Sequence, residues 1–303
     1  MKTLEIAIIA CGLAGNFESF YVFWRIRKYT NELLDNLNPN YMFMLKLIVD
    51  SFYLILQIPT IQPMYFFMSN SFCKIQVTLT YVLQAYSAWI LVFVSIERLV
   101  SVTHSQNILT NHIAVKKNQF IDIVGILIVL FALYSPAWNV YFSPDQAFSL
   151  SANNTFLSKN NTNLAYCYIP DGISNIVYQI NLLTEIMIPF LFLMVSSVLI
   201  IYSMRVLRNR LRIASSRREN RDLDYAFVIL SLDIIFLFLN FPYGVLLTLT
   251  SIDFNFMIKF IFYYFHNLSY SINIFIYMAV NRSFRIMFIT QFIELDETSL
   301  TVS

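Results

Sequence analysis

The sequence predicts an all-α fold, a bundle of seven helices that each cross a membrane. The 303-residue chain is 58% hydrophobic and 13% charged, whereas an average soluble domain is about 45–50% apolar and about 25% charged. The apolar residues gather in seven blocks, each reaching the roughly 20 residues that a helix needs to cross a bilayer. Such blocks must be helical in lipid, because a helix pairs its backbone groups internally.

The blocks follow one another with short polar connections and leave no room for a large soluble domain. Prolines stand inside four of them, at Pro59, Pro136, Pro189 and Pro242, which helices packed among neighbours tolerate. We expect spans at 4–26, 41–67, 72–103, 117–141, 174–204, 225–250 and 256–280. Residues 1–292 then form one transmembrane domain, and 293–303 form a short cytoplasmic tail.

Lysine and arginine are distributed unevenly among the connections, and this predicts the orientation. The connection after the fifth span holds seven arginines between Arg205 and Arg221, and the connections after the first and third spans and the tail are also basic. Basic loops stay in the cytoplasm. We therefore expect a plasma-membrane protein with an extracellular amino terminus and a cytoplasmic carboxyl terminus. The net charge of +2 follows from this asymmetry and indicates no nucleic-acid partner.

Features of the connection between the fourth and fifth spans agree with this orientation. It holds two glycosylation sequons, which begin at Asn153 and Asn160. Cys73 and Cys167 both fall on the extracellular side, where a disulfide persists, and a bond between them would tie this connection to the third span. Cys11 lies inside the first span and is expected to be a small apolar packing residue.

Marker residues recur along the spans. Arg98 follows Glu97 and lies 25 residues after Cys73, so about 37 Å of helix separates a cysteine at one membrane face from a charged pair at the other. The other markers are Gly15-Asn16, Leu45, Asp50, Ser87, Pro189, Phe236, Pro242 and Asn273-Ile274-Phe275-Ile276-Tyr277. In order and spacing they resemble the rhodopsin-like (class A) G-protein-coupled receptors over nearly the whole chain. The segments 73–76, 87–89 and 95–99 look like the invertebrate neuropeptide receptors of the FMRFamide-receptor group.

The resemblance implies how such a protein would signal. Glu97 and Asp222 would hold Arg98 in the inactive state, and agonist binding would free Arg98 for a heterotrimeric G protein, with Asn273 and Tyr277 taking part. Alternatively, Asp222 only balances Arg218 and Arg221 on a solvated helix face. Residues 281–292 would form an amphipathic helix on the inner membrane surface, with Phe284, Met287 and Phe288 toward lipid. Phosphorylation of the tail at Thr298, Ser299, Thr301 or Ser303 would add charge that arrestin recognises; the alternative is a plain disordered terminus.

A charged residue inside a bilayer needs a compensating partner. The resemblance implies that Asp50, Ser87, Ser269 and Asn273 form a polar cluster that holds a sodium ion; the alternative is a hydrogen-bonded core without an ion. No other cofactor is expected. Lys46 and Asp233 are expected near the inner helix ends, where they reach the interface or pair locally.

Three positions depart from the family pattern. Ile274 stands where the family has a proline, so the seventh helix is expected to bend less. Asn240 replaces a tryptophan two residues before Pro242, and Ser197 stands where a tyrosine often supports the active state. These departures leave the receptor class intact and put the details of its activation in doubt.

Residue types that some ligand classes require are absent at the corresponding positions, and this narrows the class of ligand. Thr80 and Tyr81 stand where amine receptors have an aspartate, and the middle of the seventh span has no lysine for retinal. The expected pocket is rich in amide and aromatic groups, which suit a peptide: Gln57, Gln76, Thr80, Tyr81, Gln84, Glu185, Tyr243, Leu247, Tyr263 and Asn267. Glu185 either contacts a cationic ligand group, or is protonated or hydrogen-bonded to Gln84 or tyrosines. The preferred ligand is a neuropeptide, and the alternative is a small molecule sensed by a chemosensory receptor.

Other functional classes fit less well. Transporters usually show internal repeats or broken helices rich in glycine and proline, and this chain has only 5 glycines and no visible repeat. The three histidines, His104, His112 and His266, are too scattered for a metal site, so an enzyme is not expected. A transporter is the remote alternative.

Overall fold

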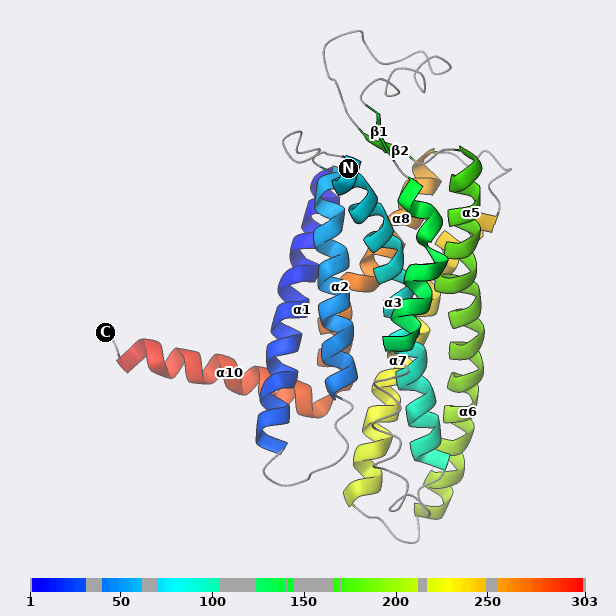
Figure 1. The fold of residues 1–303 in the computed structure, drawn as a ribbon. Helices are drawn as coiled ribbons and strands as arrows, with labels where there is room; N and C mark the ends of the chain where they lie inside the picture. Colours follow the sequence, from blue (N-terminus) through cyan, green and yellow to red (C-terminus); the bar gives the residue numbers. More distant parts are fainter. Residues whose placement is uncertain are drawn as a thin grey trace.

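The computed structural model describes residues 2–30, 40–61, 70–103, 124–139, 141–143, 166–168, 171–211, 217–248 and 256–301. These form a bundle of long helices with one small two-stranded sheet at one end (Figure 1). We call this the hairpin end and the opposite one the far end. The predicted α-helical class is confirmed, and the small sheet is an addition that the sequence patterns did not indicate.

Within the described residues, five helical stretches are long and apolar enough to cross a membrane. They are Thr3–Ile26 in α1 (Lys2–Thr30), Tyr41–Ile58 in α2 (Asn40–Ile61), Ser71–Val100 in α3 (Asn70–Thr103), Gly172–Ser203, and Ala226–Leu246 in α7 (Arg217–Thr248). The fourth of these runs without interruption through α5 (Asp171–Asn181), the π-helix η3 (Leu182–Met187) and α6 (Ile188–Leu211). Each coincides with a predicted span.

The predicted fourth span ends earlier than expected. Its described part is the helix Val124–Leu133, followed by a turn at Tyr134 and the 3₁₀ helix η1 (Ser135–Asn139). Pro136 explains the change, because proline has no N–H to donate and disfavours α-helical backbone in the residue before it. The expectation of helix through residue 141 was therefore wrong: Tyr141 begins a strand.

The predicted seventh span is broken in the middle. It consists of α8 (Phe256–Ser271) and α9 (Asn273–Val280), separated at Ile272. The break occurs although Ile274 stands where the family has proline. Asn16 of α1 meets it directly: its side-chain amide donates to the carbonyl oxygen of Tyr270 at 3.1 Å.

The small sheet pairs β1 (Tyr141–Ser143) with β2 (Tyr166–Tyr168) in antiparallel register, with Phe142 opposite Cys167. Both strands contact α3, whose first turn carries Cys73. The predicted glycosylation sites Asn153 and Asn160 lie outside the described residues.

At the far end, α10 (Arg282–Thr301) leaves the bundle and runs across it past α1 (Figure 1). The side chain of Asn281 caps it by accepting a hydrogen bond from the backbone N–H of Phe284 at 3.0 Å. The predicted helix after the seventh span is thus present, but the tail boundary expected at residue 292 falls inside it. Phe284 was expected to face lipid and instead is buried, with its ring 5.1 Å from that of Phe23 and 5.5 Å from that of Tyr277.

The core lies around α3, which packs against α2, α6, α7 and η1. Large apolar side chains are also exposed along the helices, among them Phe17, Phe52, Val195 and Phe238. Helices with apolar residues on both their packed and their outward faces suit a lipid surrounding.

Candidate functional site

Buried polar side chains form three groups inside the bundle. We name each after its carboxylate: the Glu185 network near the hairpin end, the Asp50 cluster in the middle, and the Asp233 cluster toward the far end. Polar groups are buried at a cost unless they are hydrogen-bonded, so such a set inside an apolar bundle marks the candidate functional region.

The π-helix η3 positions Glu185. The backbone N–H of Ile188 donates to the carbonyl of Leu183, five residues back, and the next N–H in this pattern would come from Pro189, which has none. The carbonyl oxygen of Thr184 accepts instead from the indole Nε1 of Trp89 at 2.9 Å. The wide turn places Thr184, Glu185 and Ile186 all in the interior, and π-turns of this kind are frequent at functional sites.

Glu185 is fully buried and hydrogen-bonded on both oxygens. Its Oε2 accepts from Nδ2 of Asn181 at 2.7 Å, and its Oε1 accepts from the hydroxyl of Tyr270 at 2.8 Å. The Nε2 of His266 lies 3.5 Å from the same Oε1. Of the alternatives for Glu185, the structure therefore shows internal hydrogen bonding, with Tyr270 and Asn181 as partners and not Gln84.

Tyr134 extends the Glu185 network toward the fourth span. Its hydroxyl donates to Oδ1 of Asn181 at 2.8 Å and lies 2.8 Å from Oγ1 of Thr184. Its ring stacks on that of Tyr81, with centroids 5.7 Å apart and planes 9° apart. Tyr134 thereby joins α3 to α5 and η3.

His266 is the centre of the Glu185 network. Its Nε2 lies 2.9 Å from Nε2 of Gln84, and its Nδ1 lies 2.7 Å from Oδ1 of Asn240. An amide nitrogen only donates and an amide oxygen only accepts. This amide assignment therefore makes Nε2 the acceptor and Nδ1–H the donor of a neutral imidazole. Asn240, one of the departures from the family pattern, thus ties α7 to α8.

Gln84 continues the chain of hydrogen bonds to α2. Its Nε2 donates to the hydroxyl of Tyr53 at 3.1 Å, and that hydroxyl donates to Oδ1 of Asn267 at 2.7 Å. Two buried amide atoms of this chain, Oε1 of Gln84 and Nδ2 of Asn267, have no hydrogen-bond partner within the described part of the protein. Unpaired buried groups of this kind are costly. The unpaired acceptor of Gln84 and the unpaired donor of Asn267 belong to the two residues that bond to the Tyr53 hydroxyl, and this pair suits a ligand amide.

The other residues of the expected pocket surround this chain. Oε1 of Gln57 accepts from the hydroxyl of Tyr263 at 3.0 Å, and Nε2 of Gln76 donates to the carbonyl oxygen of Leu56 at 3.1 Å. Tyr243 stacks on His266, with ring centroids 4.3 Å apart. Thr80 is half-buried on α3, and the side chain of Leu247 lies outside those that the structure describes.

The Asp50 cluster contains a lysine that sequence reasoning placed elsewhere. Nζ of Lys46, one turn earlier on α2, lies 2.5 Å from Oδ2 of Asp50. Ser87 donates to Oδ1 at 2.5 Å, and Nδ2 of Asn273 donates to Oδ2 at 2.8 Å. Ser269, expected in this cluster, instead donates to the carbonyl of His266 on its own helix at 2.7 Å.

These residues do not fit the sodium ion that the family resemblance implies. A hard cation binds oxygen ligands, but the ammonium group of Lys46 already contacts Asp50, which is the one carboxylate among these four residues, and would repel a second cation. The expectation of an ion at Asp50, Ser87, Ser269 and Asn273 therefore lacks support, and Lys46 is locally paired in the interior and not at a helix end.

The Asp233 cluster joins α3, α6 and α7. Asp233 is fully buried and was expected near an inner helix end. Its carboxylate accepts from Oγ of Ser95, at 2.9 Å to Oδ1 and 2.8 Å to Oδ2, and from Oγ of Ser197 at 3.2 Å. Ser197 thus has a polar partner although it replaces a tyrosine.

The expected activation residues lie near the far end. Arg98 is buried, with Nη2 3.8 Å from Oε1 of Glu97. The side chain of Asp222 lies outside those that the structure describes, so its pairing with Arg98 stays a prediction. Tyr277 is buried, with its ring edge-on to Phe23 at a centroid distance of 4.9 Å.

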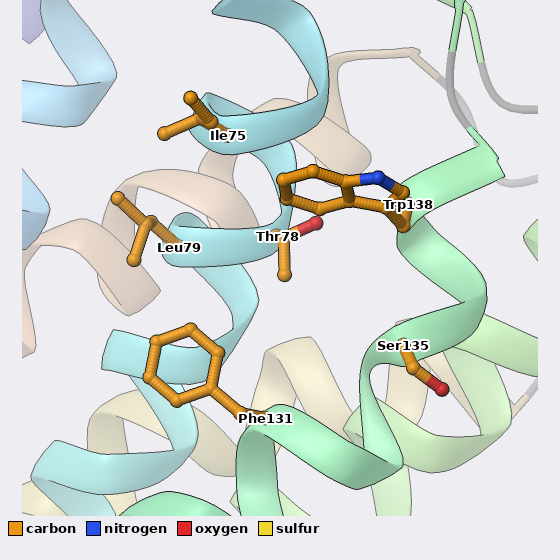
Figure 2. A pocket seen from close by; sticks show the side chains of 6 residues that line it. All are labelled: Ile75, Thr78, Leu79, Phe131, Ser135 and Trp138. Carbon is orange, nitrogen blue, oxygen red and sulfur yellow. The ribbon is translucent and has the colours of Figure 1, made fainter. Parts of the chain in front are cut away.

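A groove of about 320 Å³ opens on the outside of the bundle, between α3 and the residues 124–139. Figure 2 shows its lining, which is formed by Ile75, Thr78, Leu79, Phe131, Ser135 and Trp138. Ile75, Phe131 and Trp138 are exposed apolar side chains. The groove shares no residue with the expected ligand pocket.

No protein-family model matches this chain, and no curated protein matches it. Within the described ranges there is also no group of three or more His, Cys, Asp or Glu residues that could hold a metal ion.

Proposed function

We propose that this protein is a seven-helix receptor of the rhodopsin-like type, which carries an extracellular signal to a heterotrimeric G protein. The observation that carries the proposal is the arrangement along α3. Gln84 and Trp89 join this helix to the Glu185 network, and Ser87 and Ser95 join it to the Asp50 and Asp233 clusters. Arg98 and Glu97 follow near its far end. A change at one end of such a helix can bias contacts at the other.

The proposed seven spans comprise the five long helices, the span that contains Val124–Leu133, and α8 with α9. The basic connections favour the far end as the cytoplasmic side of the plasma membrane. The G protein would then meet Arg98 there, together with Glu97, Asp222, Asn273 and Tyr277 as residues that control coupling. Arrestin would bind the phosphorylated tail, and membrane lipid would surround the apolar faces.

We propose a peptide as the ligand, and the unpaired amide atoms of Gln84 and Asn267 support this. A peptide backbone offers both a donor and an acceptor to such a pair. One observation favours the small-molecule alternative: Glu185 already has two internal partners and is not available as a simple anchor for a cationic peptide end.

A disulfide between Cys73 and Cys167 is part of this proposal. Cys73 is buried in the first turn of α3, Cys11 is a free thiol, and the strand that carries Cys167 contacts α3. Peptide mapping under non-reducing conditions would find the linked peptides; a free thiol at Cys167 would contradict the pairing.

A signalling screen tests the proposed function. Cells that express the protein are exposed to a library of amidated neuropeptides and to small odorant-like molecules, and second messengers are recorded. Arg98→Ala serves as the uncoupled variant, and Arg205→Ala removes an exposed arginine of the same half of the bundle as the matched control.

A saturable response to one peptide family, lost in Arg98→Ala and kept in Arg205→Ala at equal surface expression, supports a peptide receptor. A response only to small molecules selects the chemosensory alternative. An Arg98→Ala variant that signals like the wild type contradicts coupling through α3.

A further inference from the structure

Lys46 and Asp50 form an ion pair in the interior of the bundle. They lie one turn apart on α2, and their side chains are 4% and 0% exposed. Both are ionisable, and neither lies where it could reach water at a helix end. A charged residue placed so deep in an apolar bundle needs a specific reason.

The hydrogen bonds around Asp50 are complete. Oδ1 accepts from Ser87, and Oδ2 accepts from Lys46 and Asn273. Asn273 also donates to Oδ1 of Asn16 at 3.2 Å. These residues come from α1, α2, α3 and α9, and all except Lys46 are neutral. The charge of Asp50 is therefore balanced by Lys46 alone among these contacts.

A second cation at the same carboxylate would be unfavourable. It would lie within a few ångströms of the ammonium group, where like charges repel strongly in a medium of low polarity. It would also have to displace the hydroxyl of Ser87 or the ammonium group of Lys46, each of which would then lose its acceptor in the interior.

We propose that Lys46 is a built-in counter-ion of Asp50, which takes the place of a bound sodium ion and makes the centre of the bundle insensitive to it. The ammonium group is covalently attached to α2, so its local concentration does not depend on the medium. This inference does not rest on the proposed receptor function, and it is tested on purified protein without a ligand.

The test compares thermal unfolding in sodium chloride and in N-methyl-D-glucamine chloride at equal ionic strength. The proteins are the wild type, Lys46→Met, Lys46→Arg, Asp50→Asn and the double variant Lys46→Met/Asp50→Asn, all in the same nanodiscs. Lys46→Arg keeps the positive charge and is the matched control for Lys46→Met.

We expect the wild type and Lys46→Arg to have the same Tm in both salts. Lys46→Met should have a lower Tm in N-methyl-D-glucamine and should regain part of it as sodium rises, because Asp50, Ser87 and Asn273 are then open to the ion. The double variant should be more stable than Lys46→Met and should show no response to sodium.

Three results would overturn the proposal. One is a saturable increase of the wild-type Tm with sodium that Asp50→Asn abolishes. Another is a Lys46→Met variant that folds and shows no sodium response. The third is a double variant that is no more stable than Lys46→Met, which would show that Lys46 does not balance Asp50. If Lys46→Met does not fold, Lys46→Gln replaces it in these comparisons.

Discussion

At the scale of single residues, Asp233 joins three helices, although it was expected only near an inner helix end. It binds Ser95 of α3 and Ser197 of α6 from its own position on α7. Hydrogen bonds to a charged group contribute about 1.5–3 kcal/mol each. In the proposed receptor these bonds hold the sixth span against the third and fifth, on the same half of the bundle as Arg98.

Replacing Asp233 should therefore favour the active state. Asp233→Val keeps a similar volume and accepts no hydrogen bond. We expect basal second-messenger production, measured without ligand, to rise roughly tenfold, because about 1.4 kcal/mol shifts an equilibrium by that factor. Ser231→Ala is the control, since among the described residues this hydroxyl bonds to the carbonyl oxygen of Phe227 on its own helix. Unchanged basal signalling at normal surface expression would show that the Asp233 cluster does not restrain activation.

At the scale of elements, α1 packs very closely against the broken seventh span. A Cβ atom at Gly12 would lie 2.4 Å from Oγ of Ser271, and one at Gly15 would lie 2.8 Å from Cγ2 of Ile274. Glycine is used here for close approach of two helices. The hydrogen bond from the side-chain amide of Asn16 to the carbonyl oxygen of Tyr270 depends on this close approach.

Gly12→Ala should therefore destabilise the protein by about 1–3 kcal/mol, the usual cost of inserting atoms into a packed interior. The matched control is Gly125→Ala, because nothing lies within 4 Å of a Cβ at that position. In a helix, the control should be neutral or stabilising by about 0.5–1 kcal/mol. Thermal unfolding in nanodiscs measures both; equal Tm changes for the two variants would show that α1 is not packed as described.

The π-helix η3 is the second feature at this scale. One extra residue in the turn rotates Asp171–Asn181 relative to α6, so that Asn181 meets Tyr134 while Glu185 meets Tyr270. Without the inserted residue, Asp171–Asn181 would be oriented differently relative to α6, because each residue of an α-helix turns the chain by about 100°.

Deleting Leu183 should convert this turn to regular α-helix. The preceding helix would rotate, the bonds of Tyr134 to Asn181 and of Trp89 to Thr184 would be lost, and both the Tm and the response to ligand should fall. Leu183→Ala is the control, because the Leu183 side chain is exposed and its truncation keeps the turn. A deletion variant with the Tm of the wild type would mean that the π-turn is dispensable.

At the scale of the whole molecule, orientation in the membrane decides which end receives the ligand. The basic connections predict that the far end is cytoplasmic. An epitope tag at the amino terminus should then be accessible on intact cells, and one at the carboxyl terminus only after permeabilisation. The reverse pattern would place Arg98 on the outside and exclude coupling through it.

The positions of the spans were predictable, because hydropathy is a property of consecutive residues. The five long helices coincide with predicted blocks. The two other blocks show the limits of this reasoning. Pro136 ends the fourth helix early, which its chemistry explains, but the break at Ile272 has no proline at the position where the family has one.

The candidate site was predictable only in part. Gln84, Glu185 and Asn267 were expected in one region, and they do lie together: Gln84 and Asn267 belong to one chain of hydrogen bonds, and Glu185 lies 3.5 Å from His266 beside it. The pairing of His266 with Asn240 and the role of Asp233 were missed, because both depend on which faces of two distant helices meet. The i, i+4 spacing of Lys46 and Asp50 was a signal that could have indicated their pairing.

The sequence by itself determined that the chain forms apolar helices of membrane-spanning length, and it indicated their orientation, because these properties are sums over local residue types. Only the tertiary structure decided which buried charges are compensated and by what. Asp50 carries the same charge whether its partner is an ion or a lysine. Lys46 reaches it along α2, but only the packing of α3 and α9 against this helix brings Ser87 and Asn273 to it.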